Sequence, residues 1–491
     1  MTDVHSEDLV APHYPVSTSS VPPAVSHPVG ELAHRQAVER LVASYRAIPS
    51  SSTVRLAKET SNLFRVRSEG PVVGLDVSGL RGVVSIDPVN RTADVQGMCT
   101  YEDLVAATLP HGLMPFVVPQ LKTITLGGAV TGLGIESTSF RNGLPHESVL
   151  ELDILVGTGE VVTARPTGEH ADLFRGFPNS YGSLGYATRL RIELEPTKPA
   201  VALRHVHFPN LDQLQQALET IVATGEYNGE PIDFLDGVVF AEDDSYLTLG
   251  QWSDHRHDLS DYTGRKIFYR SVRGLGSDAL TVHDYLWRWD PDWFWCSGAF
   301  LAQNPVVRAL WPARYRRSDV YHRIVGLENR YGVMAKIDAW RGKPARERVI
   351  QDVEVPVNRT ADFMRWFIRE VRMSPVWLCP LRLRDDSPVG PLSAGEQPWS
   401  LYPLKAGTTY VNVGFWGTVP IEPGRADGDV NRKVEEAVDS FDGHKSLYSS
   451  AFYDEETFWA KYGGAAYRGL KDRYDPQGRL TDLYSKVVRS R

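Results

Sequence analysis

Residues 119–143 read PQLKTITLGGAVTGLGIESTSFRNG, and this stretch decides the fold prediction. It holds Gly127, Gly128, Gly132, Gly134 and Gly143, with small and hydroxyl side chains between them. Glycine lets a backbone approach a ligand closely, and successive N–H groups then cradle a pyrophosphate. The spacing GGxxxGxG differs from the GxGxxG of a Rossmann fold, and no Gly-Lys-Ser/Thr follows as in a Walker loop. The alternative is a tightly packed glycine turn inside a β domain.

An acidic residue follows these glycines directly. Glu136 would repel the phosphates of a ligand held by the loop. It is therefore better suited to a ribityl or ribose hydroxyl, or to the edge of a flavin ring. Ser137 beside it adds a hydroxyl donor. The alternative is that Glu136 is exposed to solvent or paired locally.

The surrounding residues 54–196 predict an α+β module. Residues 82–96, 150–165 and 186–195 alternate as strands do, and residues 101–111 predict a short helix that ends at Gly112. Two further loops lie in this module, KETSNLF at residues 58–64 and DLFRGFPNSYGSLG at residues 172–185. The three loops together suit one elongated cofactor that carries phosphate.

The chain changes character after residue 197. Strand patterns at residues 201–207, 238–250 and 410–415 alternate with helices such as 211–224, which indicates a second α+β domain. Helices are also predicted at residues 449–453, 455–471 and 480–488. Residues 1–30 have early acids and scattered Pro and Ser without an apolar core. We therefore expect a flexible tail there rather than a signal peptide.

The composition excludes several classes of protein. Of 491 residues, 42% are hydrophobic and 23% are charged, and the net charge is −8, so neither a fibrous protein nor a nucleic-acid binder is expected. No run of 18 apolar residues predicts a transmembrane helix. Three scattered cysteines, Cys99, Cys296 and Cys379, exclude a disulfide framework and a Cys-rich metal site. The cytosol is the simplest location, and we expect no bound metal.

The three-loop module resembles the FAD-binding domain of the vanillyl-alcohol-oxidase flavoproteins, the PCMH-type fold. Within that superfamily the chain is similar to sterol Δ24-reductases and to bacterial methylene-fatty-acid reductases. The resemblance is carried by LGGAVTGLGIESTS (126–139), DLFRGFPNSYGSLGYATRLRI (172–192), QDVEVP (351–356), VWLCPLRL (376–383) and LYSSAFYDEETFWAKYGG (447–464). It implies an α+β fold with a disordered tail (1–30), an FAD-binding domain (31–197), a substrate-binding cap domain (198–440) and a C-terminal helical segment that completes the flavin site (441–491).

The resemblance also implies a set of cofactor residues. The glycine loop would line the FAD pyrophosphate, the loop at 172–185 would approach the adenosine or the ring, and the loop at 58–64 would meet a phosphate. These residues are Ser61, Asn62, Thr125, Leu126, Gly127, Gly128, Thr131, Gly134, Ile135, Glu136, Ser137, Gly182, Ser183 and Gly185, with Lys471 near the flavin. The loop at 58–64 has neither His nor Cys, so we expect non-covalent FAD, with NADPH or NADH as the electron donor.

Reduction of an isolated C=C bond needs a proton donor as well as a hydride. Tyr410 and His283 are the candidates, and a core position is the alternative for His283. Four tryptophans in WRWDPDWFW suit a membrane interface or the mouth of a hydrocarbon site, with a core cluster as the alternative. They are Trp287, Trp289, Trp293 and Trp295. The nearby Arg308, Arg314, Arg316 and Arg317 either meet anionic headgroups or form a solvated helix face.

The resemblance favours an FAD-dependent reductase of a lipid C=C bond. The expected substrate is a 10-methylene-branched fatty acyl chain of a phospholipid, reduced to the 10-methyl chain, and a Δ24-sterol reductase is the second interpretation. An FAD oxidase or dehydrogenase of a sugar lactone or polyprenyl-linked sugar is another alternative, as is a non-catalytic flavin- or lipid-binding protein. Candidate partners are the inner face of the cell membrane, a second copy of the chain, and a methyltransferase that supplies the methylene lipid.

Overall fold

The computed structural model describes residues 28–58, 64, 72–332, 336 and 340–489. Most of the expected tail therefore lies outside the described residues, but its last residues belong to the fold, because the N–H of Val29 donates to the carbonyl of Val83. The first helix, α1 (Glu31–Ala47), buries Ala37, Leu41 and Tyr45, and the Tyr45 hydroxyl donates to the carbonyl of Gly157. Two parallel strands, β1 (Thr53–Ala57) and β2 (Val72–Asp76), follow it.

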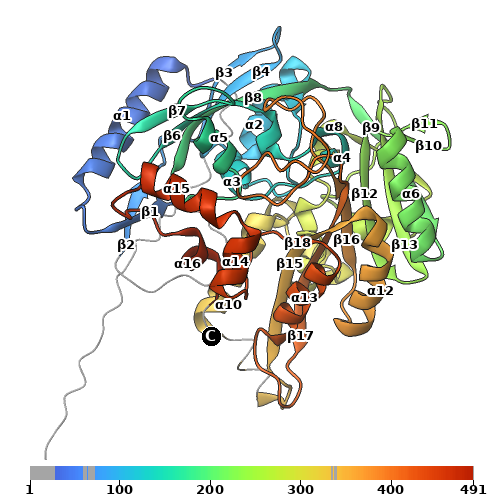
Figure 1. Cartoon of the computed structure of the whole chain (residues 1–491). Coiled ribbons are helices and arrows are strands. Elements are labelled where there is room, and N and C mark those ends of the chain that lie inside the picture. Colours follow the sequence, from blue (N-terminus) through green and yellow to red (C-terminus); the bar gives the residue numbers. More distant parts are fainter. Residues whose placement is uncertain (1–27, 59–63, 65–71, 333–335, 337–339, 490–491) are drawn as a thin grey trace, which may run out of the picture.

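A six-stranded sheet forms the N-terminal half of the molecule (Figure 1). Its order is β3-β4-β8-β6-β7, and β5 also pairs with β8. The strands are β3 (Val83–Asp87), β4 (Thr92–Gln96), β5 (Leu113–Pro115), β6 (Val149–Leu155), β7 (Val161–Ala164) and β8 (Tyr186–Pro196). The helices between them are α2 (Tyr101–Thr108), α3 (Leu126–Thr131), α4 (Ser139–Asn142) and α5 (Ala171–Gly176). Each strand and helix expected between residues 82 and 195 is confirmed.

An eight-stranded antiparallel sheet forms the second half, in the order β14-β9-β13-β12-β16-β17-β15-β18. Its strands are β9 (Ala200–Phe208), β12 (Phe234–Ala241), β13 (Asp244–Ser253), β14 (Ser277–Thr281), β15 (Arg346–Pro356), β16 (Val376–Leu381), β17 (Tyr410–Pro420) and β18 (His444–Lys445). The single strand expected at residues 238–250 is wrong: β12 and β13 form a hairpin there, because Glu242 and Asp243 make a tight turn. The last strand, β18, lies beyond residue 440.

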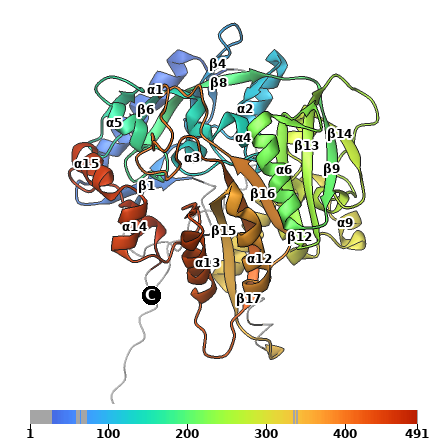
Figure 2. The same cartoon turned by 45° about the vertical axis from the view of Figure 1, so that its right-hand side comes forward.

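The two faces of this sheet differ in what covers them. Three helices, α6 (Leu211–Thr224), α12 (Thr360–Glu370) and α13 (Asp429–Ser440), lie against one face, and Figure 2 shows them in front of the strands. That face is apolar: Val353 and Val355 of β15 and Val411 and Val413 of β17 belong to one core cluster with the helices. Because side chains alternate along a strand, the residues between these valines point to the opposite face. We call that face the inner face, since it turns toward the six-stranded sheet.

The C-terminal segment returns to the first half of the molecule. It contains α14 (Glu455–Lys461), α15 (Gly464–Tyr474) and α16 (Leu483–Val487), which Figure 1 shows beside β1 and α5. Tyr474 donates its hydroxyl to Asp172 at 2.8 Å, and Leu480 bridges to Val54. Two helix predictions need correction. Residues 449–453 are not helical, and the helix expected at 455–471 is interrupted at Gly463, whose φ of 66° is left-handed.

The α+β prediction is confirmed, with two sheets and helices interleaved along the chain. Within the part of the chain that the structure describes, no helix is both long and apolar enough to cross a membrane.

Candidate functional site

The glycine loop begins as a short helix that packs tightly against the six-stranded sheet. Thr125 caps α3, since its hydroxyl accepts the N–H of Gly128. The N–H of Gly127 donates to the carbonyl of Gly97 at 3.0 Å, and a Cβ on Gly127 would lie 2.6 Å from that oxygen. Glycine is therefore required at this position by the packing of two backbones. Leu126 is buried in the core, and the Thr131 hydroxyl donates to the carbonyl of Gly127.

The residues after α3 offer backbone donors to a ligand. Among the described residues, no acceptor is bonded to the N–H groups of Gly132, Leu133, Gly134 and Ile135. Three of these four residues are buried, although buried N–H groups are normally paired. Consecutive unpaired N–H groups form a site for an anion. This loop therefore fits the pyrophosphate of a dinucleotide such as FAD, as the glycine pattern predicts.

The second predicted loop lies directly against the first. The N–H of Tyr181 donates to the carbonyl of Thr131 at 2.8 Å, so Gly182 and Ser183 follow at the same place. Ser183 donates its hydroxyl to the carbonyl of Ser180 and is fully buried. Gly185 packs against the backbone of Leu155 in β6. The structure thus brings two of the three predicted loops together, while Ser61 and Asn62 of the third lie outside the described residues.

Lys471 positions the second loop and has no donor left for a cofactor. Its ammonium donates to the carbonyls of Ser183 at 2.9 Å and Leu480 at 2.7 Å, and it pairs with Asp475 at 2.6 Å. An ammonium has three N–H groups, and all three are used. Lys471 therefore holds α15 against the loop. This structural role takes the place of the contact with the flavin that the resemblance implies.

Glu136 and Ser137 form a buried polar cluster with the eight-stranded sheet. Glu136 pairs with Arg288 at 3.0 Å, and Arg288 also pairs with Asp236 of β12 at 2.8 Å. Ser137 donates its hydroxyl to Glu136 at 2.8 Å and lies 2.7 Å from the hydroxyl of Tyr285. These side chains are almost completely buried. The alternative that Glu136 is a locally paired acid is thus what the structure shows.

The ionisable side chains of this cluster are buried between the two halves of the molecule. Burial raises the pKa of Glu136, and the charge of Arg288 opposes that rise. Burial also raises the pKa of Tyr285 well above its usual value. Oε2 of Glu136, Oδ1 of Asp236 and Nε of Arg288 have no hydrogen-bond partner within the described part of the chain. Oε2 of Glu136 therefore has capacity for one further donor, such as a ribityl hydroxyl.

The inner face of the eight-stranded sheet carries a second set of buried ionisable groups. Asp352 and Glu354 of β15 stand opposite Gly414 and Asn412 of β17. A Cβ at Gly414 would lie 2.5 Å from Oδ1 of Asp352, so glycine there makes room for the acid. On β16, Cys379 is paired with Asn412 and lies on the same face. A polar surface is thus buried where the two halves meet.

Asp352 has an acidity suited to proton transfer near neutral pH. Its Oδ1 accepts from Nδ2 of Asn412 at 3.2 Å, and the hydroxyl of Tyr448 also bonds to it. Tyr448 in turn accepts from Nε1 of Trp416 at 2.7 Å. Burial raises the pKa of Asp352 to about 7, and these hydrogen bonds together with the charge of Lys445 oppose the rise. A general acid works best when its pKa lies near the working pH.

Glu354 and His444 form a buried pair beside Asp352. Oε2 of Glu354 lies 3.4 Å from Nε2 of His444, and neither atom has a hydrogen-bond partner among the described residues. Burial raises the pKa of Glu354 well above its usual value and lowers the pKa of His444 to about 3. At neutral pH the imidazole of His444 is therefore uncharged. The ring of Tyr402 lies 5.8 Å from that of His444, and its hydroxyl also has no partner in the described structure.

The two predicted proton donors lie in different environments. Tyr410 is buried at the start of β17, on the inner face, with its ring 5.2 Å from that of His444. Burial raises its pKa. The structure contradicts the prediction for His283, whose side chain is 57% exposed and pairs with the adjacent Asp284. The helix α8 (Val282–Leu286) buries Val282, Tyr285 and Leu286 and so turns His283 toward solvent.

The tryptophan cluster belongs to the core, which corrects its predicted exposure to a membrane. Trp287, Trp289 and Trp293 are between 1% and 7% exposed, and Trp295 is partly buried. The indole of Trp289 donates to Asp236, and that of Trp295 donates to the carbonyl of Trp416 at 3.0 Å. These aromatic side chains pack on the inner face of the sheet. The core alternative is therefore correct, while Trp295 remains close to the site through Trp416.

Phe64, which follows Ser61 and Asn62 in the sequence, lies at the same place. Its ring lies 5.8 Å from that of Trp293 and 6.1 Å from that of Tyr448, and its carbonyl accepts the N–H of Ser450. The chain that follows Ser61 and Asn62 thus reaches the inner face beside Asp352. We take the space between the glycine loops and this face as the candidate active site.

Asp352 and Glu354 were not among the predicted site residues. The pattern QDVEVP could have indicated them, because its two acids alternate with two valines along β15. When helices cover the face of a strand that carries the valines, the acids point to the opposite face. There they are either exposed to solvent or buried in a functional site.

Comparison with known proteins agrees with this geometry. Residues 36–165 match the FAD binding domain family. The chain is 24% identical over 431 residues to Delta(24)-sterol reductase from Homo sapiens, which covers 85% of this chain and 76% of the relative. It is 25% identical over 448 residues to Delta(24)-sterol reductase from Arabidopsis thaliana, with 85% and 77% covered.

A second kind of relative shares a smaller part of the chain. Cytokinin dehydrogenase 5 from Arabidopsis thaliana is 28% identical over 206 residues, or 39% of this chain and 38% of the relative. The similarity to the sterol reductases therefore extends into the eight-stranded sheet, beyond the residues that match the FAD binding domain. The chain is an FAD-dependent oxidoreductase with an FAD-binding domain at residues 36–165, and it is similar to Delta(24)-sterol reductases over most of its length.

Proposed function

We propose that the chain reduces an isolated C=C bond of a lipid, with Asp352 as the proton donor. Bound FAD supplies a hydride to one carbon, and the protein must deliver a proton to the other. The single observation that carries this proposal is the buried carboxylic acid of Asp352 on the inner face, opposite Gly414 and hydrogen-bonded to Asn412. Burial raises the pKa of this acid to about 7. Asp352 is protonated below that pH and regains its proton from water after each turnover.

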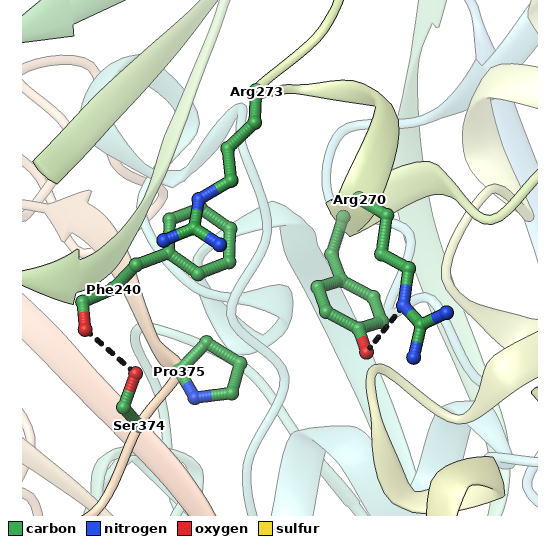
Figure 3. A pocket seen from close by; sticks show the side chains of 6 residues that line it. Phe240, Arg270, Arg273, Ser374 and Pro375 are labelled. Atoms are coloured by element: carbon green, nitrogen blue, oxygen red, sulfur yellow. Dashed lines mark hydrogen bonds between the residues drawn. The ribbon is translucent and has the colours of Figure 1, made fainter.

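The proposed route for an apolar substrate starts at a surface cavity of about 540 Å³. It is lined by Phe240, Tyr269, Arg270, Arg273, Ser374 and Pro375 (Figure 3). The ring of Tyr269 lies 6.3 Å from that of Trp295, which lies 5.2 Å from the ring of Trp416. Trp416 donates to Tyr448, the partner of Asp352. Aromatic side chains therefore connect the cavity to the proposed acid, which suits a hydrocarbon.

The first candidate substrate is a sterol with an alkene in its side chain. This choice follows the names of the relatives that match most of the chain. The second candidate is a methylene-branched acyl chain of an anionic phospholipid, which the charge at the cavity favours. Figure 3 shows Arg273 over the Phe240 ring, and Arg270 across the cavity, where its Nε donates to the hydroxyl of Tyr269. Arg273 pairs with Asp244, whereas exposed Arg270 has no acidic partner in the described structure, so its charge suits a phosphate.

We further propose that FAD is held without a covalent bond and that NADPH or NADH reduces it. The sequence has no second dinucleotide motif, so the nicotinamide would visit the flavin and leave before the lipid binds. The reaction then balances: the nicotinamide loses a hydride, and the alkene gains a hydride and one proton.

The test is an anaerobic half-reaction assay on the holoenzyme. NADPH or NADH should bleach the flavin absorbance, and a lipid alkene should restore it. In Asp352→Asn, bleaching should be unchanged while reoxidation by the lipid slows by about 100-fold or more, as expected for loss of a general acid. Reoxidation by the wild type should slow as the pH rises through about 7, since Asp352 then loses its proton.

Glu147→Gln is the matched control. Burial also raises the pKa of Glu147 to about 8, but this acid lies in the turn before β6 and accepts the N–H groups of Leu144 and Arg384. Its variant should keep the pH profile of the wild type. Arg270→Gln should raise the KM for an anionic acyl lipid and leave the KM for a neutral sterol unchanged. Reduction of the flavin by a sugar lactone, or reoxidation by oxygen but by no lipid alkene, would contradict the proposal.

A further inference from the structure

Exposed apolar side chains gather in one segment of the chain. Ten large apolar side chains are exposed among the described residues, and seven of them fall between residues 301 and 340. We call these seven the apolar patch: Leu301, Val306, Leu310, Tyr315, Leu327, Tyr331 and Trp340. Single exposed apolar residues are normal, but a concentration of them indicates an interaction surface.

The patch is built on two helices that meet. The helix α9 (Pro305–Leu310) is followed by the turn η5 (Ala313–Tyr315) and by α10 (Ser318–Tyr331). Between them lies an apolar hollow of about 500 Å³, lined by Val307, Leu310, Trp311, Pro312, Tyr315 and Val320. On α10, the exposed side chains of Leu327 and Tyr331 lie one turn apart and so share one face of the helix.

The patch is fixed to the core of the molecule. Arg308 of α9 makes a buried ion pair with Asp292 at 2.7 Å, next to the tryptophan cluster. Arg317, just before α10, pairs with Glu102 of α2 at 2.7 Å. Ser318 donates its hydroxyl to buried Asp290. The exposed side chains are therefore presented on a rigid support.

The same segment is strongly basic. Residues 301–345 contain nine Arg and Lys against three Asp and Glu, a formal charge of +6 in a chain whose net charge is −8. Exposed cations flank the patch along its length: Arg314, Arg323, Lys336, Arg341 and Lys343. Arg314 also lies 4.8 Å from the ring centre of Tyr315. Apolar side chains and cations thus occur together in a segment whose charge is opposite in sign to the net charge of the chain.

We propose that this surface docks the enzyme on the face of an anionic lipid bilayer. Apolar side chains enter the headgroup region while the flanking Arg and Lys meet lipid phosphates. A second copy of the chain fits less well, because a two-fold contact would place +6 against +6. A nucleic acid would leave Leu310 and Trp340 without an apolar environment. The proposal does not depend on which lipid is reduced.

Vesicle flotation of the purified holoenzyme tests the proposal. The wild type should bind vesicles of phosphatidylcholine with phosphatidylglycerol, bind phosphatidylcholine alone much more weakly, and detach as salt is raised. Arg314→Gln and Arg323→Gln should each lower the partition coefficient about fivefold. Leu310→Glu should reduce binding further, and flavin content with circular dichroism should confirm that it folds.

Val89→Glu is the matched control, since Val89 is 88% exposed in the turn between β3 and β4 and lies outside the patch. It adds the same charge and should bind vesicles like the wild type. Equal binding of Leu310→Glu and wild type would overturn the proposal, as would binding that ignores anionic lipid. A wild-type dimer that Leu310→Glu converts to a monomer, with no change in vesicle binding, would assign the patch to a second copy instead.

Discussion

Replacement of Asp352 by Asn should stabilise the protein at alkaline pH while it removes the proposed proton donor. Asn has nearly the shape of a protonated Asp and carries no charge. Its amide can still accept from the hydroxyl of Tyr448 and contact Asn412, which are the partners of Asp352. The variant therefore separates the charge of residue 352 from its packing.

The magnitude follows from the pKa. Burial raises the pKa of Asp352 from 3.8 to about 7 in the folded protein. A group whose folded pKa is raised binds more protons when folded, so the free energy of unfolding falls as the pH rises between the two values. Each unit of pKa shift corresponds to about 1.4 kcal/mol of the free energy of unfolding. The shift of Asp352 therefore lowers this free energy by about 4 kcal/mol in total, of which about 3 kcal/mol is lost between pH 5 and pH 7. Above pH 7 the free energy of unfolding does not fall further through Asp352.

Urea unfolding of both proteins at pH 5 and pH 8 measures this quantity. Other titrating groups affect both proteins alike, so the difference between them isolates residue 352. The variant should gain about 3 kcal/mol relative to the wild type between the two pH values. If both proteins change in parallel, Asp352 is not held neutral at pH 5. The proton donor would then have to be sought at Glu354 or Tyr410.

Three other changes test the loops and the buried cluster. Gly127→Ala places a Cβ 2.6 Å from a carbonyl oxygen, so flavin content should fall several-fold by absorbance, whereas Gly469→Ala meets no atom within 4 Å and should retain it. Arg288→Ala leaves two buried carboxylates without a cation and should cost about 3–5 kcal/mol in urea unfolding. Arg273→Ala, at an exposed pair, should cost less than about 1 kcal/mol. Lys471→Met should speed loss of FAD during gel filtration, because the second loop loses its fastening to α15.

Local patterns predicted most elements of the fold. The helix α6 and the strands from β3 to β8 follow from periodicity and from turn residues, which act over a few neighbouring positions. The errors arose where a pattern was ambiguous. The turn at Glu242 and Asp243 contains neither Gly nor Pro, so residues 238–250 looked like one strand. One helix was predicted across Gly463 because the residues on both sides of it have helical spacing.

The site was harder to predict than the fold because its parts are distant in sequence. The glycine loop was found from its composition, but Asp236 and Arg288, which hold Glu136, are separated from it by 100 residues or more. The tryptophan cluster had the composition of either a core or an interface, and only its packing against β16 and β17 decides between them. The apolar patch, in contrast, lies in residues that showed no unusual composition apart from their basic charge.

The two buried polar clusters are built to behave differently. In the first cluster, the guanidinium of Arg288 stays charged at any relevant pH. The ion pair between the two halves of the molecule therefore does not depend on pH through Arg288. In the second, no Arg side chain pairs with Asp352 or Glu354 in the described structure. Their nearest cation is Lys445, whose own pKa is lowered by burial. Burial without a permanent counter-charge raises the pKa of Asp352 to about 7. An acid that gains and loses its proton near neutral pH is what the proposed reduction of a C=C bond requires of the inner face.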